Sequence, residues 1–245
     1  MAGAAALAGR AALKLGAGLV FVGSPARPEY DPQQPELMWR VPEALFSGTR
    51  LTALAAGPGM GQSPAARVLL GKVLTIELPL VLDADALNLI SADEPLQVAL
   101  AARRPASTIL TPHPTEAARL AGSDTAAIQS DRVGAASRLA EQFHAIVVLK
   151  GAGSVIAAPD GRWWINPTGN PGMASGGMGD VLSGMLVALL AQGLAPQAAT
   201  LLGVYLHGAA ADALVQRGIG PVGLTASEVI DEARVLLNRW IGQGA

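Results

Sequence analysis

Short, fully apolar segments alternate with segments of helical spacing through most of this chain, and this alternation limits it to a few folds. The apolar segments are bounded by Gly, Pro or Asp and show no polar alternation, which is typical of buried strands in a parallel sheet. The predicted strands cover residues 19–22, 51–56, 80–82, 108–110 and 146–149. The predicted helices cover residues 3–15, 64–77, 86–102, 114–121 and 131–143. Strands and helices in this order predict an α/β fold.

The second half of the chain adds a hairpin and a helical end. Pro-Asp-Gly at residues 159–161 separates strand candidates at 154–157 and 162–165, which predicts a β-hairpin. Further helices are predicted at 180–192, 196–216 and 226–240. We therefore expect a single domain over residues 1–245, a three-layer α/β/α fold around a mainly parallel central sheet. Because no strand comes before helix 3–15, we expect the first strand of that sheet to be missing from this sequence.

The composition excludes several classes of protein. Hydrophobic residues make up 51% and charged residues 15% of the chain, which allows a large core and argues against disorder. The net charge is −2 and there is no basic block, so the sequence does not suggest a surface that binds nucleic acid. The absence of cysteine excludes disulfides and a cysteine nucleophile and fits a cytoplasmic protein. No run approaches the roughly 18–20 uninterrupted apolar residues of a membrane span, so we expect no membrane partner.

Residues 166–184 carry the strongest functional signal. Five glycines and two prolines lie in 166–179, and apolar residues at helical spacing follow, which predicts a helix from near Gly179 to near Gly193. A glycine-rich loop that leads into a helix exposes unpaired N–H groups at the positive end of the helix dipole, a binding site for an anion and most often for phosphate. Asp180 then lies beside the anion and is interpreted as a base or polariser. A surface loop before a capped helix remains the alternative for the short Gly-Gly-x-Gly-Asp motif.

Other motifs follow the predicted strands. Glycines at 57–61 allow close approach of a ligand or form a tight turn. Asp83 and Asp85 either cap a helix or bind a ribose, a metal or a substrate amide. Lys150 precedes glycines and can serve as a point charge for phosphate, although the lysine comes too early for a Walker loop.

The histidines differ in their settings. Prolines on both sides fix the backbone around His113, and Glu116 lies one turn into the following helix, where it could hold magnesium through water. The alternative for this pair is a rigid loop with a helix-capping histidine. His207 lies on an apolar helix and is interpreted as a core histidine whose hydrogen bonds are satisfied.

Together these motifs resemble the ADP/ATP-dependent NAD(P)H-hydrate dehydratase family, a branch of the ribokinase-like superfamily. The matching segments keep the family's order along the chain: residues 3–5, 16–20, 57–61, 82–88, 110–116, 149–154 and 166–184. The resemblance implies an enzyme that phosphorylates the hydroxyl of hydrated NADH or NADPH and releases phosphate, which restores the reduced cofactor. It also implies Mg²⁺, ADP or ATP as co-substrate, and a homo-oligomer.

The resemblance also assigns roles to individual residues. It implies that Asp180 is the base and that Gly177 and Gly179 form the anion hole. The implied nucleotide contacts are Lys150, Gly151, Ala152, Gly153, Ser154 and Gly179. The implied substrate contacts are Ala4, Gly59, Gly61, His113 and Asp180. Glu116 is the implied magnesium ligand, at a distance or through water.

Three positions depart from the family pattern: Met178 and Ser175 replace threonine, and Thr115 replaces glycine. Loss of the hydroxyl at 178 costs a contact to phosphate worth about 1.5–3 kcal/mol. Two alternatives remain open at this point. One is a ribokinase-like kinase of a small alcohol, against which residues 111–116 and 166–172 argue. The other is a catalytically decayed nucleotide-binding module, against which the retention of Asp180, Lys150 and His113 argues.

Overall fold

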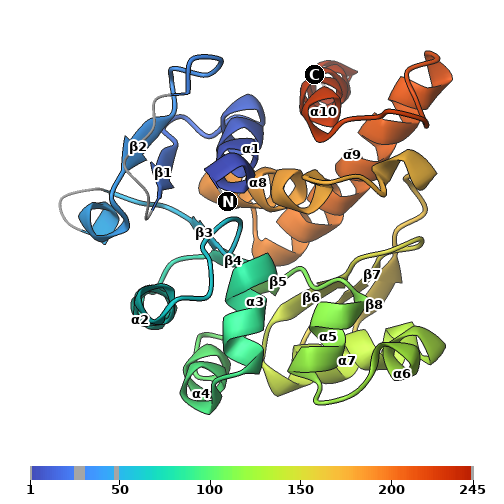
Figure 1. The fold of residues 1–245 in the computed structure, drawn as a ribbon. Coiled ribbons are helices and arrows are strands. Elements are labelled where there is room, and N and C mark those ends of the chain that lie inside the picture. Colours follow the sequence, from blue (N-terminus) through green and yellow to red (C-terminus); the bar gives the residue numbers. More distant parts are fainter. Residues whose placement is uncertain (1, 25–30, 47–49, 244–245) are drawn as a thin grey trace.

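A mixed, mainly parallel sheet forms the centre of the molecule (Figure 1). The computed structural model describes residues 2–24, 31–46 and 50–243. The sheet has the order β3-β4-β5-β6-β7-β8, and a separate parallel pair joins β1 to β2. Strands β3 to β6 are parallel, whereas β7 and β8 are antiparallel to their neighbours. The strands are β1 (Phe21–Gly23), β2 (Met38–Arg40), β3 (Leu54–Ala56), β4 (Leu80–Leu82), β5 (Thr108–Leu110), β6 (Ile146–Leu149), β7 (Val155–Ala157) and β8 (Trp163–Ile165).

Most predicted strands are confirmed. β4, β5 and β6 have the predicted bounds, and β7 and β8 form the predicted hairpin. β1 begins two residues later than predicted, at Phe21, and β3 covers only the end of 51–56. β2 was not predicted, because its three residues carry no pattern of their own and, in the part of the chain that the structure describes, pair with β1 alone.

The helices also follow the prediction closely. They are α1 (Ala2–Lys14), α2 (Pro64–Leu74), α3 (Ala84–Ser91), α4 (Glu94–Ala101), α5 (Pro114–Leu120), α6 (Thr125–Ser130), α7 (Arg132–Gln142), α8 (Met178–Ala191), α9 (Pro196–Gln216) and α10 (Ala226–Gln243), with short 3-10 turns at Pro42–Phe46 and Pro171–Met173. The predicted helix 86–102 is wrong as one element. Asp93 accepts a hydrogen bond from the N–H of Leu96 and starts a second helix there.

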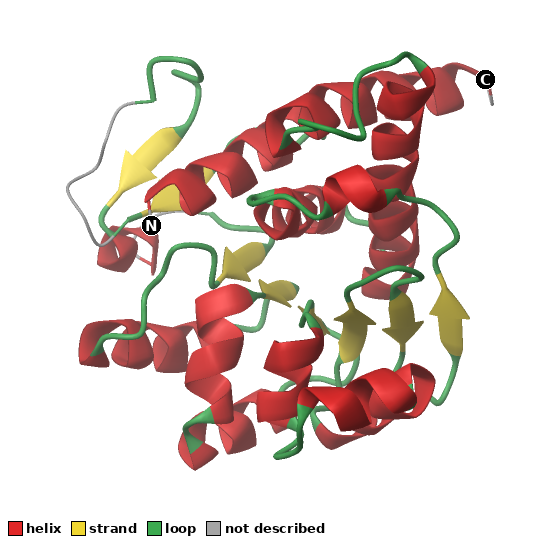
Figure 2. Cartoon of the chain, turned by 45° about the vertical axis from the view of Figure 1, so that its right-hand side comes forward, coloured by secondary structure: helices red, strands yellow, loops and turns green. Residues whose placement is uncertain are grey.

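Alternate residues of each strand face opposite helical layers. Leu80 and Leu82 pack with α2, α3 and α4, whereas Val81 packs with α8 and α9 on the other face. Figure 2 shows the strands between these two layers of helices. The predicted three-layer α/β/α architecture is therefore confirmed.

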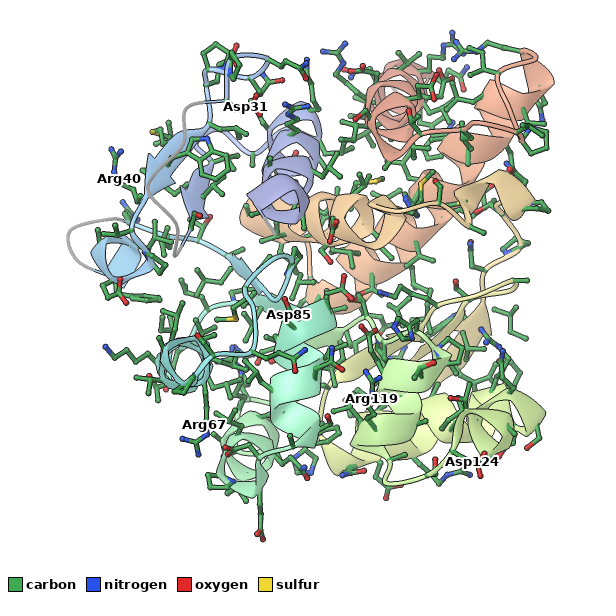
Figure 3. The ribbon with its side chains drawn as sticks, in the orientation of Figure 1. Asp31, Arg40, Arg67, Asp85, Arg119 and Asp124 are labelled. Carbon is green, nitrogen blue, oxygen red and sulfur yellow. The ribbon has the colours of Figure 1, made fainter. Side chains whose placement is uncertain are left out.

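Helix α1 packs closely along α8. A Cβ at Gly184 would lie 2.2 Å from the carbonyl oxygen of Ala8, so only glycine allows this approach. The guanidinium of Arg10 on α1 makes two 2.7 Å hydrogen bonds with the buried carboxylate of Asp31 (labelled in Figure 3). This bidentate pair holds the described segment ahead of β2 against α1.

Helix α9 is long and apolar enough to match a membrane span by length and composition. However, 56% of its most apolar window is buried inside the protein, where it packs against α8 and α10. That burial is the pattern of a core helix.

Candidate active site

The N-terminus of α8 presents unpaired main-chain donors. Gly177 precedes the helix with φ of 92°, and a Cβ there would lie 2.7 Å from the side chain of Leu7, so the position requires glycine. In the described part of the chain, the N–H groups of Met178, Gly179 and Asp180 donate to no protein acceptor. These donors at the positive end of the helix dipole form a site for an anion.

Lys150 brings a positive charge to the same helix end. Its Nζ lies 2.7 Å from Asp83 Oδ1, and a Cβ at Gly179 would lie 3.2 Å from that Nζ. The other oxygen of Asp83 accepts a 3.0 Å hydrogen bond from Ser183, one turn along α8. Asp83 is 1% exposed and belongs to the loop after β4. It therefore ties three elements together: the β4 end, the β6 end and α8.

Asp180 is half-buried beside this cluster. Burial raises the pKa of its carboxyl group, and the negative charge of Asp83 raises that pKa further. No hydrogen bond or ion pair joins the Asp180 side chain to another described residue. A free carboxylate with a raised pKa is suited to accept a proton.

His113 and Glu116 form a capping box at the start of α5. His113 Nδ1 accepts from the N–H groups of Thr115 and Glu116, and Glu116 Oε2 accepts from the N–H of His113 at 2.8 Å. The helix-capping alternative for His113 is thus realised. Because the imidazole is 47% exposed, it can still contact a ligand.

The carboxylate of Glu116 is already engaged. Beyond the capping bond, Lys150 Nζ lies 3.9 Å from its Oε2, and His113 Nε2 lies 3.3 Å from its Oε1. Among the described residues, no group of three or more metal-binding side chains comes together. These residues do not fit a direct protein cage for magnesium, since the lysine already neutralises the carboxylates.

The glycine loop after β3 is held by the loop after β4. A Cβ at Gly57, where φ is 125°, would lie 1.7 Å from the carbonyl oxygen of Asp83, so this glycine is needed for packing. Asp85 accepts a 2.8 Å hydrogen bond from the N–H of Gly61, and Figure 3 labels it at the start of α3. Between the two aspartates, Ala84 has a strained φ of 47°. The two carboxylates on either side of Ala84 have different partners: Asp83 pairs with Lys150, and Asp85 accepts from the glycine loop.

The nucleotide-binding segment predicted at 150–154 is an exposed turn. Ser154 donates to the carbonyl of Gly151 and accepts from its N–H, so the hydroxyl closes the turn. Arg132, the first residue of α7, donates to the carbonyls of Leu149, Lys150 and Gly153 at 3.1–3.4 Å. This arginine holds the turn in shape.

We expect Arg132→Met to raise the dissociation constant of adenine nucleotides about tenfold, because three carbonyls of the turn lose a charged donor. Isothermal titration calorimetry measures this constant. Arg138→Met is the matched control, since Arg138 lies on the same helix and, among the described residues, pairs only with exposed Asp131. Equal effects of the two variants would contradict the role of Arg132.

The loop before α8 is anchored by α9. Asp212 accepts hydrogen bonds from the N–H of Gly169 at 2.8 Å and from the side-chain amide of Asn170 at 2.9 Å. Ser175 donates to the carbonyl of Leu224. Met178 is 5% exposed and packs in the apolar cluster of α1, α8 and α10. Its side chain thus leaves the helix N-terminus open, and its N–H remains available there.

Ala4 and His207 are both buried. Ala4 is buried in α1, one turn before the Leu7 that contacts Gly177. His207 is 7% exposed, and its Nε2 has no hydrogen-bond partner among the described residues. The interpretation of His207 as buried is confirmed, but its hydrogen bonds are not satisfied. Burial, and to a smaller extent the charge of Lys150, lowers the pKa of His207 to about 4.

Acid is expected to destabilise the protein through His207. The pKa of His207 is about 4 in the folded protein, against an ordinary value of 6.5, so below pH 6.5 the unfolded chain takes up a proton that the folded chain does not. The contribution of neutral His207 to the free energy of unfolding is fully present above pH 6.5, and about 3 kcal/mol of it is lost as the pH drops toward 4. Urea denaturation against pH measures the loss, which His207→Leu should remove. The control His144→Asn, at an exposed histidine with positive φ, should keep it.

Sequence reasoning missed three residues that shape the site: Ser183, Arg132 and Asp212. Two of them carried a signal. Arg132 places a positive charge in the first turn of a helix, where the dipole disfavours it, and Asp212 interrupts an otherwise apolar helix. Ser183 has no such signal, because its partner Asp83 lies 100 residues away.

Comparison with known sequences identifies the family of this chain. A family model described as NAD(P)H-hydrate dehydratase matches residues 1–233. A bifunctional NAD(P)H-hydrate repair enzyme of Coxiella burnetii is 43% identical over 246 residues, which are 97% of this chain and 48% of that protein. An ADP-dependent (S)-NAD(P)H-hydrate dehydratase of Neisseria meningitidis is 41% identical over 246 residues, covering 98% and 82% of the two chains.

A solved structure of a protein with the same described activity is also similar to this chain. The ADP/ATP-dependent NAD(P)H-hydrate dehydratase of Bacillus subtilis, co-crystallised with ATP/Mg²⁺, has a TM-score of 0.81 with this chain at 34% identity. The match covers 98% of this chain and 86% of that one. The chain thus spans about half the length of the Coxiella protein and most of the length of the single-function relatives.

Proposed function

The chain belongs to the NAD(P)H-hydrate dehydratase family, and we propose that it restores NADH and NADPH from their hydrated forms at the expense of ADP or ATP. The observation that carries this proposal is the cluster at the N-terminus of α8. There, unpaired N–H groups, the ammonium of Lys150 and the free carboxylate of Asp180 meet. A nucleophilic hydroxyl and a terminal phosphoryl group need these three features together.

In the proposed reaction, Asp180 accepts the proton of the hydroxyl on the hydrated nicotinamide ring. The resulting oxygen attacks the terminal phosphorus, and the bond from that phosphorus to the nucleotide's bridging oxygen breaks. Phosphate then leaves the ring carbon, and the ring loses a proton from the adjacent carbon to restore its double bond. Phosphorylation is useful because hydroxide alone is a poor leaving group.

The negative charge that develops on the transferring phosphoryl group needs fixed positive partners. The N–H groups of Met178 and Gly179 point out of α8, and Lys150 is held beside them by Asp83. Donors that are already fixed cost no reorganisation during the reaction. Gly177 and Gly179 thus act through backbone geometry, while the 150–154 turn supports the nucleotide.

We place magnesium on the nucleotide phosphates, with Glu116 reached through water. Both oxygens of Glu116 are engaged by His113 and Lys150, which leaves no room for direct coordination. A magnesium ion neutralises phosphate charge when bound. The Bacillus subtilis relative was crystallised with ATP/Mg²⁺, which supports the ion's use with this fold.

We propose that His113, Gly59, Gly61 and Ala4 contact the hydrated dinucleotide. His113 is exposed beside Glu116, and the glycine loop is fixed by Asp85. We also propose a cytoplasmic homo-oligomer. Two features of β8 support this assembly: no described strand pairs with its outer edge, and its side chains Trp163 and Ile165 are 50% and 54% exposed.

The decisive experiment follows recovery of reduced-nicotinamide absorbance from a hydrated NADH or NADPH preparation. Parallel reactions contain magnesium with ADP, ATP or neither nucleotide. Recovery that depends on nucleotide supports the proposal and identifies the phosphoryl donor. Binding of nucleotide without recovery would favour the small-alcohol kinase, which can be tested by release of a stable phosphoester, or a catalytically decayed module.

A further inference from the structure

The proposed reaction moves two protons in its second half. As phosphate leaves the ring, a double bond forms between the carbon that held it and a neighbouring carbon, so the neighbouring carbon loses a proton. Asp180 already holds the hydroxyl proton at this stage, and the departing phosphate is a strong acceptor for it. Asp180 therefore acts as an acid in this step. A different group has to act as the base that takes the proton from carbon.

The order of the strands gives the candidate site two sides. The 150–154 turn, which supports the nucleotide, follows β6, whereas the glycine loop at 57–61 and Asp85 follow β3 and β4. Asp83 lies beside the N-terminus of α8, because a Cβ at Gly179 would lie 3.4 Å from Asp83 Oδ2. A nucleotide that enters over β6 leaves the side of β3 and β4 for the hydrated ring. The second base is therefore expected after β3 or β4.

Four other ionisable groups of the site do not meet this requirement. Both oxygens of Asp83 accept bonds that hold the site together. One oxygen of Glu116 accepts from the N–H of His113, and the other lies 3.3 Å from His113 Nε2. His113 Nδ1 accepts from two main-chain N–H groups, which occupies its lone pair. His207 Nε2 has no partner among the described residues, but it lies on α9, which packs against β5 and β6, on the side of the nucleotide.

Asp85, labelled in Figure 3, differs from these groups. Its Oδ2 accepts a 2.8 Å bond from the N–H of Gly61, whereas its Oδ1 meets only the side-chain amide of Gln62 among the described residues, at 3.3 Å. Gln62 is exposed, and a hydrogen bond of that length is weak, so a substrate atom can displace it. Burial and the charge of Asp83 are the main causes of the raised pKa of Asp180, and the charge of Asp85 adds to them. Asp85 thus carries a negative charge within electrostatic reach of Asp180 and keeps one oxygen for the substrate.

We propose that Asp85 is the second base of the reaction, an inference that rests on the proposed function. The carbon–oxygen bond to phosphate breaks, and its electron pair leaves with the phosphate, which takes the proton held by Asp180. The bond between the neighbouring carbon and its hydrogen supplies the electron pair of the new double bond, and the proton passes to Oδ1 of Asp85. Water reaches this partly buried carboxylate and removes the proton before the next turnover. Two carboxylates thus divide the acid and base roles of one elimination.

Asp85→Asn separates this role from the anchoring of the glycine loop. Asparagine keeps an oxygen that accepts from the N–H of Gly61 but takes no proton. We expect the variant to bind nucleotide and to transfer the phosphoryl group near the wild-type rate, while recovery of reduced nicotinamide slows about 10²–10³-fold. One equivalent of nucleotide should therefore be consumed in a burst before absorbance recovers. Quenched-flow analysis of ADP or AMP formation, with magnesium and hydrated NADH, measures this burst.

A substrate labelled with deuterium gives a readout that a merely structural role would not change. Hydration in heavy water of NADH that already carries deuterium at the neighbouring carbon labels both hydrogens of that carbon. In Asp85→Asn, removal of deuterium limits turnover, so the isotope effect on recovery should exceed that of the wild type. Asp85→Glu keeps a carboxylate and should regain part of the rate, with a smaller isotope effect. Gln62→Ala is the matched control and should keep the wild-type rate and isotope effect, because it removes only a neutral partner of Asp85.

Three results would contradict these expectations in different ways. Wild-type recovery in Asp85→Asn with an unchanged isotope effect would overturn the proposal, since the departing phosphate or Asp180 then takes the proton. Loss of nucleotide consumption together with recovery, in both Asp85→Asn and Asp85→Glu, would leave Asp85 only as an anchor of the glycine loop. A wild-type protein that neither consumes nucleotide nor restores reduced nicotinamide would contradict the proposed function itself, which distinguishes the two failures.

Discussion

Asp180→Asn is expected to lower kcat by about 10²–10⁴-fold while nucleotide still binds. The substitution keeps the shape of the side chain but removes its ability to accept a proton from the substrate hydroxyl. The main-chain N–H groups of α8 and Lys150, which hold the phosphates, stay in place. Recovery of reduced nicotinamide measures kcat, and calorimetry measures nucleotide affinity.

The same variant should unfold at a higher temperature than the wild type at pH 7. Burial and the charge of Asp83 raise the folded-state pKa of Asp180 above its ordinary value of 3.8. Its protonated form therefore stabilises the fold at low pH, and this contribution is lost as the pH rises through the folded pKa. Asparagine stays neutral and loses nothing, so the difference in Tm should grow with pH and then level off.

Asp160→Asn is the matched control for both effects. Asp160 is an exposed residue of the β7–β8 hairpin, paired with Arg162, and its pKa is lowered by that hydrogen bond. We expect this control to keep full turnover and to gain no Tm at pH 7. Wild-type turnover in Asp180→Asn would show that Asp180 is not the base. A lower Tm in this variant would contradict the argument that the ionised carboxylate destabilises the fold.

Activity should also depend on pH through Asp180. The carboxylate is active only when ionised, so kcat/KM should rise with pH across its raised pKa, above the range of an ordinary aspartate. Variants that gain stability and lose function are common at active sites, where charged groups are held in environments that destabilise the fold.

The position of Asp180 in the sequence could not predict the environment of its carboxylate, because Asp83 comes from a loop nearly 100 residues earlier.

Local signals in the sequence were enough for most of the fold. The buried strands β4, β5 and β6 are apolar throughout and are bounded by turn residues, so their bounds were predictable. The start of α10 was equally predictable, because Thr225 and Glu228 have the spacing of a capping box, and the two side chains do bond to each other. Elements without such signals, such as β2, depend on pairing with a distant strand and escaped prediction.

The residues of the candidate site were predictable, but the contacts between them were not. Strand ends in an α/β sheet meet at one edge, which is why Asp83, Lys150 and Glu116 could be expected near one another. The sequence did not show that Lys150 lies between the two carboxylates, and this fact changes the expectation for magnesium. Residues whose partners are remote, such as Ser183 and Asp212, require the three-dimensional structure.

Lys150→Met is expected to lower the free energy of unfolding by about 3–5 kcal/mol and to weaken nucleotide binding. Lys150 Nζ is the cation within 2.7 Å of Asp83 and 3.9 Å of Glu116, and both carboxylates are almost fully buried. Without the ammonium, the buried carboxylate of Asp83 keeps only the hydrogen bond from Ser183 among the described residues, and Glu116 keeps only its contacts with His113. Because the charge of Lys150 also lowers the pKa of Asp180, that pKa should rise in the variant. Denaturant unfolding at pH 7 measures the loss.

A double variant separates the unpaired charge from lost packing. Lys150→Met with Asp83→Asn replaces the ion pair by neutral groups, so it should be more stable than Lys150→Met alone, although still unable to hold phosphate tightly. Ser183 can still donate to the asparagine oxygen in the double variant. If the double variant is no more stable than the single one, the buried charge of Asp83 is not the source of the loss. Stability and phosphate binding would then depend on Lys150 separately, and the ion pair would serve only to aim the ammonium at the N-terminus of α8.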